Sequence, residues 1–182
     1  LVAYDVSLQL PQVRRPITGL RIVFHRAEGT PAGGYGFGTI SDPPPSPEGT
    51  FILTSFSASA ESVPGDQVNL NRLIDVLRAT ADCWNSNFRP EGVLDTGISG
   101  WSPEAGHEGT TQVTVTFDKP LNASETPFLT AQLNFGYGRQ LVAAKFEIFA
   151  VTGADDGSPL PKDIIAIIQA MPEQRSAEQR EQ

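Results

Sequence analysis

The stretch TTQVTVTFDKPL, residues 110–121, decides the fold. Val113, Val115 and Phe117 alternate with threonines, among them Thr114, in a period of two. That period predicts a strand whose valines and phenylalanine face a core and whose threonines face solvent. A helix would need apolar residues three and four positions apart, which this stretch lacks.

Similar segments lie on both sides of this strand. Seventeen glycines and 15 prolines in 182 residues separate them with turn signals. The count of seven or eight strands predicts an all-β chain, folded as a β-sandwich or jelly roll. A helical turn is expected at residues 71–75 and a hairpin turn at GYGR, residues 136–139. The other predicted strands cover residues 4–10, 17–27, 50–60, 76–82, 127–138 and 141–153.

The end of the chain differs in character. Residues 1–153 are predicted to form the sandwich, and residues 154–182 a C-terminal helix followed by a linker. Asp163 lies in the first turn of that helix, where a carboxylate suits the helix dipole. Four isoleucines between positions 164 and 168 form its apolar stripe.

Composition excludes several classes of function. A net charge of −8 and a pI near 4.7 argue against nucleic acid as a partner. No apolar run is long enough for membrane insertion. Cys83 is the one cysteine, so no internal disulfide can form, and we expect it to act as a small buried side chain. His107 with Glu104 and Glu108 is interpreted as a solvated loop, because no nucleophile motif accompanies it. The chain is therefore not expected to be an enzyme.

The strongest ligand candidate is Trp84, in the polar loop DCWNSNFRP. Asn85, Asn87 and Arg89 flank it, and amide and guanidinium groups beside an aromatic ring are suited to binding sugar hydroxyls. The alternative is that this tryptophan packs within the loop.

Other aromatic residues are candidates for the same surface. Tyr35 and Phe37 stand between glycines in GGYGFGT, and Tyr137 stands beside Arg139. Trp101 is either a sugar platform or a core anchor at the start of a strand, and burial is the commoner fate of tryptophan.

Several motifs, in their order along the chain, resemble a module of large planctomycete-type surface proteins that also carry cytochrome-c-like domains. The resemblance runs from about Val6 to the C-terminus. It rests on ITGLRIVFHRA, GGYGFG, GTFILTSFSASA, RATAD, GVLDTGISGW, AAKFEIFAVTG and the closing PLPKDIIAIIQAMPEQRSAEQR.

That module is similar to galactose-binding-like sandwiches, including discoidin domains and carbohydrate-binding modules. In those domains an Asp-Gly turn followed by a tryptophan often holds a structural Ca²⁺. The resemblance implies that Asp95 and Ser99 supply oxygens to such an ion; an Asx-turn formed by Asp95 is the alternative.

Two departures from the family pattern weigh against the ion. Thr96 replaces the glycine of the turn, and Ser55 replaces a glutamate that the family often has. Glu147 would substitute for that glutamate only if the strands bring it close.

Together these features predict a non-catalytic carbohydrate-binding module, for a polysaccharide or other glycan, within a larger secreted, periplasmic or cell-surface protein. The alternative is a structural module that packs against other domains of the same parent protein and binds no glycan.

Overall fold

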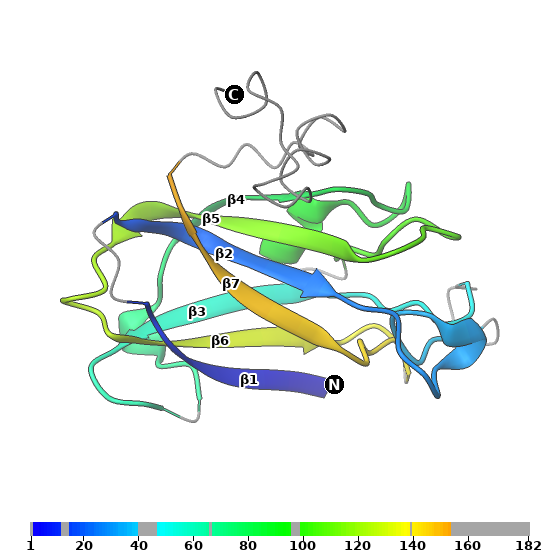
Figure 1. Ribbon diagram of the computed structural model, residues 1–182, viewed down its shortest axis with the longest axis horizontal. Coiled ribbons are helices and arrows are strands. Elements are labelled where there is room, and N and C mark those ends of the chain that lie inside the picture. The colour runs from blue at the N-terminus through cyan, green and yellow to red at the C-terminus, as the bar shows by residue number, and fades with distance from the viewer. Residues whose placement is uncertain are drawn as a thin grey trace, which may run out of the picture.

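The computed structural model describes residues 2–11, 15–39, 47–65, 67–95, 99–138 and 140–153, whose seven strands form two sheets that pack face to face (Figure 1). The predicted all-β sandwich is confirmed, whereas the helix expected within residues 154–182 lies outside the described residues. The elements are β1 (Val2–Gln9), β2 (Ile17–Phe24), η1 (Pro31–Gly33), β3 (Ser55–Glu61), η2 (Leu70–Arg72), β4 (Val76–Ala81), η3 (Pro90–Leu94), β5 (Thr111–Leu121), β6 (Phe128–Phe135) and β7 (Phe146–Thr152).

Every strand pairing within the described part of the chain is antiparallel. One sheet has the order β1-β6-β3 and the other the order β4-β5-β2-β7. Consecutive strands β6 and β7 therefore belong to different sheets. The hairpin predicted at residues 136–139 is wrong, because the chain crosses there from one sheet to the other.

The alternation that identified β5 is present in the structure. Val113, Val115 and Phe117 are buried between the sheets. Thr114 faces away from them as predicted, yet it is also buried, because the neighbouring strand covers it: Arg21 donates a hydrogen bond from Nε to the Thr114 hydroxyl over 3.2 Å.

Two of the predicted strands begin later than their sequence suggests. β3 starts at Ser55 rather than at residue 50, and β7 starts at Phe146 rather than at residue 141. The residues before each strand are still buried, but they bond to each other across the molecule: the Ile52 N–H donates to the Leu141 carbonyl over 3.1 Å. Sequence periodicity does not distinguish such buried coil from strand.

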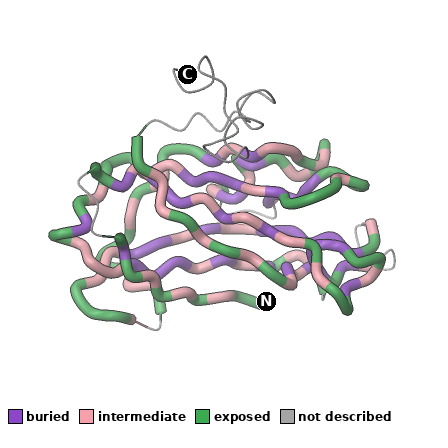
Figure 2. The backbone as a smooth tube through the Cα atoms, viewed as in Figure 1, coloured by how far each residue is buried: buried purple, intermediate pink, exposed green. Residues whose placement is uncertain are grey.

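A cluster of aromatic rings fills the core between the sheets. Phe24 and Phe51 stack with their ring centroids 4.5 Å apart, and the Trp101 ring lies 5.5 Å from each. All three side chains are fully buried. The buried residues gather between the two layers, and the exposed ones lie on the outer faces and at the ends (Figure 2). Aromatic packing of this kind therefore joins the two sheets.

Trp101→Ala is expected to lower the free energy of unfolding by about 3–5 kcal/mol, because it removes a fully buried ring and leaves a cavity. Urea denaturation followed by far-UV circular dichroism measures the loss. Trp84→Ala is the matched control, and since its ring is exposed we expect a change of about 0.5 kcal/mol or less. Similar losses in the two variants would contradict this assignment of the core.

Candidate functional site

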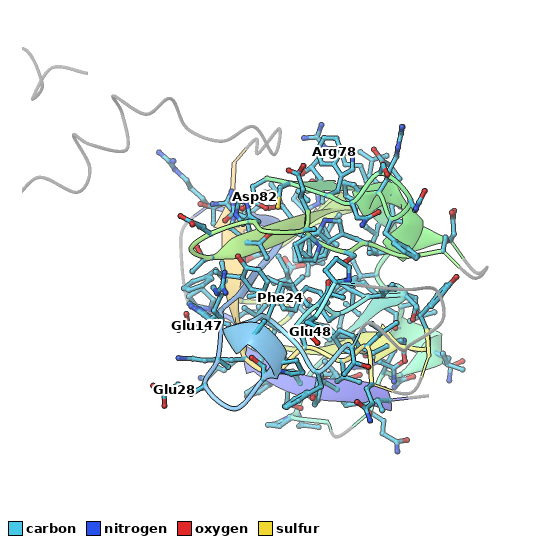
Figure 3. All side chains as sticks on the ribbon, turned by 90° about the vertical axis from the view of Figure 1, so that its right-hand side faces the viewer. Phe24, Glu28, Glu48, Arg78, Asp82 and Glu147 are labelled. Carbon is cyan, nitrogen blue, oxygen red and sulfur yellow. The ribbon has the colours of Figure 1, made fainter. Side chains whose placement is uncertain are left out.

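The loops at one end of the sandwich gather most of the predicted ligand residues. Strands β2, β4 and β6 finish at this end and β5 and β7 begin there (Figure 1). We call it the loop end, and its described residues are 25–37, 82–89, 102–110, 136–138 and 140–145. In Figure 3, which looks onto the loop end, Glu28 and Glu147 lie toward the rim and Glu48 lies nearer the middle.

Trp84 is exposed at the loop end, with 46% of its surface accessible. The backbone on either side of it is held by hydrogen bonds. Asn85 donates its N–H to the Ser102 carbonyl over 2.8 Å, and Phe88 donates its N–H to the Asn85 carbonyl over 2.9 Å. The ring is thus presented to solvent by an ordered backbone, which lowers the entropic cost of binding a ligand.

The polar neighbours of Trp84 divide into two kinds. Asn85 closes an Asx-turn, since its side-chain oxygen accepts the Asn87 N–H over 3.0 Å. Its side-chain oxygen is therefore engaged within the loop. Asn87 and Arg89 are exposed on the same loop, so both side chains are accessible beside the tryptophan.

A second aromatic pair joins two parts of the loop end. Phe88 and Tyr137 meet edge to face with their ring centroids 5.3 Å apart, and both are partly exposed. The structure thus brings Tyr137 against the loop that carries Trp84. Phe88 was not among the ligand residues predicted from sequence, although its place in the Trp84 loop was a usable signal. Arg139 lies outside the described residues.

The glycine-rich segment presents only one of its two rings. Phe37 is exposed to 44%, whereas the Tyr35 ring is buried. Gly36 between them is required for a close approach, because an added Cβ would lie 2.5 Å from the Val142 carbonyl oxygen. The close approach that this glycine permits is therefore an approach to the chain's own backbone.

Two predicted ligand residues have inaccessible rings. Tyr35 is 5% exposed, and Trp101 is fully buried with its indole N–H donated to the Cys83 carbonyl over 2.9 Å. Neither ring face is open to a sugar, so both are left out of the proposed binding surface. Trp101 instead acts as a core anchor, the alternative interpretation of its sequence.

A hollow of about 310 Å³ opens at the loop end above Tyr35. Its polar lining includes Arg26, Glu48, Glu104 and His107. The Arg26 guanidinium is held by backbone carbonyls, at 2.8 Å from Nε to Gly33 and 3.2 Å from Nη2 to Ala32. The loop read from sequence as merely solvated therefore forms one wall of a depression, whose volume is at the lower limit of typical ligand pockets.

Burial alters the acid–base behaviour of two groups at the loop end, Tyr35 and Cys83. Burial raises the pKa of the Tyr35 hydroxyl, although the Arg26 charge opposes this. Burial also raises the pKa of the Cys83 thiol, although the Thr111 hydroxyl lies 3.4 Å from its sulfur. Both groups are thus held in their neutral forms at neutral pH, and Cys83 is not an activated nucleophile.

The described residues at the two ends of GVLDTGISGW pack against each other. Gly92 and Gly100 pack backbone against backbone, since a Cβ on Gly92 would lie 2.7 Å from the Gly100 nitrogen. The Ser99 hydroxyl lies within hydrogen-bond distance of the Gly92 carbonyl at 3.1 Å and the Asp95 carboxylate at 3.2 Å. Thr96, Gly97 and Ile98 lie outside the described residues.

The described residues do not provide a carboxylate-rich cage for calcium. Asp95 is exposed and supplies a single carboxylate, and no group of three or more His, Cys, Asp or Glu side chains gathers in the part of the chain that the structure describes. Glu147 does not substitute: it lies on β7, at the opposite edge of the sheet from β4 and η3, and pairs with His25 Nε2 at 2.6 Å. Since Ca²⁺ takes six to eight oxygens, an ion here would depend on backbone carbonyls and water.

The chain was compared with family models, curated proteins and solved structures, and none of them matches it.

Tyr35→Phe is expected to lower the free energy of unfolding at pH 7 by about 1 kcal/mol, because the hydroxyl donates to a backbone carbonyl, with His107 and Gly109 each 3.1 Å away. The raised pKa of Tyr35 also makes this stabilisation depend on pH. The stabilisation is complete below the unfolded tyrosine pKa of about 10 and is lost as the pH rises through the folded value. Urea titrations from pH 7 to 11 should therefore show the difference between the two proteins shrinking; a constant difference would contradict this.

Cys83 is expected to react with iodoacetamide more slowly than free cysteine at pH 8, because its raised pKa lowers the thiolate fraction and the side chain is half-buried. Mass spectrometry of timed samples measures the rate. In urea the rate should rise to that of the free amino acid, which serves as the control. Equal rates in the native and unfolded proteins would contradict a buried thiol.

Proposed function

We propose that this chain is a non-catalytic carbohydrate-binding module that holds a neutral polysaccharide at the loop end. The single observation that carries the proposal is the exposed ring of Trp84 on a loop fixed by backbone hydrogen bonds. A flat aromatic face in that setting suits the apolar C–H face of a sugar ring, and rigid presentation limits the entropy lost on binding.

The polar groups beside the ring complete the proposed mechanism. Asn87 and Arg89 donate hydrogen bonds to sugar hydroxyls, and the amide nitrogen of Asn85 does the same. Phe37, together with the Phe88–Tyr137 pair, extends the apolar surface for further sugar units. Each sugar hydroxyl exchanges bonds to water for bonds to protein, so affinity per site is low.

Charge favours a neutral glycan over an acidic one. Glu48 and Glu104 line the hollow, and Glu28 and Glu147 lie toward the rim of the loop end (Figure 3). With a net charge of −8 for the whole chain, this surface repels uronic-acid and sulfated polysaccharides. A structural calcium ion on Asp95 and Ser99 remains part of the proposal, with its other oxygens drawn from the backbone or water.

The proposed setting is a larger secreted, periplasmic or cell-surface protein. A glycan outside the cytoplasm is the partner that such a surface would meet. Among the described residues, no helix is both long and apolar enough to cross a bilayer.

A second candidate is a module that packs against neighbouring domains of its parent protein. An apolar patch at the other end of the sandwich favours it. Leu70, Leu73 and Leu77 are exposed to 78%, 47% and 62%, and Leu73 lines an open hollow of about 430 Å³. Exposed leucines in such a cluster are a common mark of a contact surface.

Trp84→Ala is expected to weaken binding to a neutral polysaccharide by at least about tenfold, which corresponds to about 1.4 kcal/mol. Affinity electrophoresis in gels containing a β-glucan, a mannan or a galactan measures it, with an unrelated acidic protein as reference for mobility. The ring is exposed, so the fold should survive and the melting temperature should stay unchanged.

Leu77→Ala provides the matched control, because it removes another exposed apolar side chain away from the loop end. It should leave mobility in every gel unchanged. If none of the three polysaccharides retards the native protein, glycan binding is rejected for them and the apolar patch becomes the leading candidate surface.

A further inference from the structure

The two open sides of the sandwich differ in how they are covered. On one side η3 packs against both β3 and β4 and closes the gap between the sheets. On the other side lie β1 and β7, brought together by a ring contact of 5.5 Å between Tyr4 and Phe146. Of the seven described strands, these two have no buried residue (Figure 2).

The edges of β3 and β4 are protected. The Ile74 N–H donates to the Ala58 carbonyl over 2.8 Å, so the segment around η2 covers the edge of β3. A bulge between Val76 and Arg78 distorts the start of β4. Covered or bulged edges of this kind do not accept another strand readily.

β7 lacks such protection. No proline or bulge interrupts FEIFAVT. The side chains on the solvent-facing side of β7 form a row of Glu147, Phe149 and Val151. The solvent-facing side chains of β1 include three polar ones, Asp5, Ser7 and Gln9. The one charge in the β7 row, Glu147, lies toward one end of the strand. An edge with an exposed phenylalanine at its centre and no proline or bulge invites pairing with another strand, and within the described residues nothing pairs with the outer edge of β7.

The register shows which backbone groups that edge presents. The His25 N–H donates to the Lys145 carbonyl over 3.0 Å, so this pair is hydrogen-bonded. Hydrogen bonding alternates along an antiparallel ladder. The backbone N–H and C=O groups of Glu147 and Phe149 therefore also point toward β2. The N–H and C=O groups of the residues between them, Ile148 and Ala150, face outward.

We propose that β7 is the interface through which two copies of this chain associate. β7 of one copy pairs antiparallel with β7 of the second copy about a two-fold axis, which joins the two four-stranded sheets into one continuous sheet. A self-complementary patch of this kind is what a two-fold homodimer requires.

The sequence of β7 is compatible with its own copy in the register centred on Phe149. Ile148 then forms hydrogen-bonded pairs with Ala150 of the second copy, which uses the outward-facing groups of both strands. Phe149 lies opposite Phe149 of the second copy, and aromatic pairs stabilise non-hydrogen-bonded positions. Glu147 lies opposite Val151 of the second copy, so no like charges meet directly although the chain is strongly acidic.

Sedimentation equilibrium of the full 182-residue chain tests the proposal. The native protein should show a concentration-dependent dimer. Ala150→Pro should weaken dimerisation by at least about 100-fold, because it removes an outward N–H while sparing the pairing with β2. Ala3→Pro, on the outer edge of β1, is the matched control and should dimerise as the native protein does.

A second variant covers the case in which the proline variant does not fold. Phe149→Glu places like charges at the centre of the interface, while Arg21 on β2 lies opposite this position within the monomer. It should be a folded monomer by circular dichroism and sedimentation. A native protein that stays monomeric at about 1 mM, or dimers of equal strength in both variants, would overturn the proposal.

Cross-linking tests the register. In a Cys83→Ser background, Phe149→Cys should form a disulfide-linked dimer under mild oxidation, since opposed non-hydrogen-bonded residues have Cα atoms about 4.5 Å apart. Glu147→Cys should not cross-link, because its counterpart lies opposite a different residue. Equal cross-linking of both, or of neither, would refute the register centred on Phe149.

If residues 154–182 or an extended peptide of another protein occupy this edge instead, the chain will be monomeric and the proposal fails.

Discussion

The hydrogen bond from the Trp101 indole to the Cys83 carbonyl, 2.9 Å long, connects the core to the surface that we propose binds ligand. The Trp101 ring packs between the sheets on Phe24 and Phe51, and its polar edge holds the residue next to Trp84. A buried ring with one satisfied donor therefore fixes the position of an exposed ring. Loss of this contact would release the loop as well as weaken the core.

The two proposed surfaces lie on different parts of the sandwich and do not compete. The loop end presents Trp84, whereas the β7 edge runs along the side of the molecule (Figure 1). Because β7 begins at the loop end, antiparallel pairing of two copies would direct their loop ends away from each other. Such a dimer would join two separate glycan chains rather than bind one chain twice, so its gain in avidity would depend on a network of chains.

Sequence reasoning succeeded where a short-range pattern has one physical solution. The alternation of Val113, Val115 and Phe117 in β5 required a sheet with one buried face, and the structure has it. It failed where the partner of a segment is distant. The buried coil before β7 has the same composition as a strand but bonds to Ile52, and the turn after β6 leads to the other sheet.

The sequence by itself determined the all-β class, the acidic surface and the placement of Trp84 in a polar loop, because composition, charge and period-two alternation are local properties of the chain. Only the tertiary structure decided that Trp101 and Tyr35 are covered while Trp84 and Phe37 are accessible. It also decided that Glu147 lies beside His25 and away from Asp95. Exposure and proximity depend on which strands become neighbours, and long-range pairing between segments sets that order.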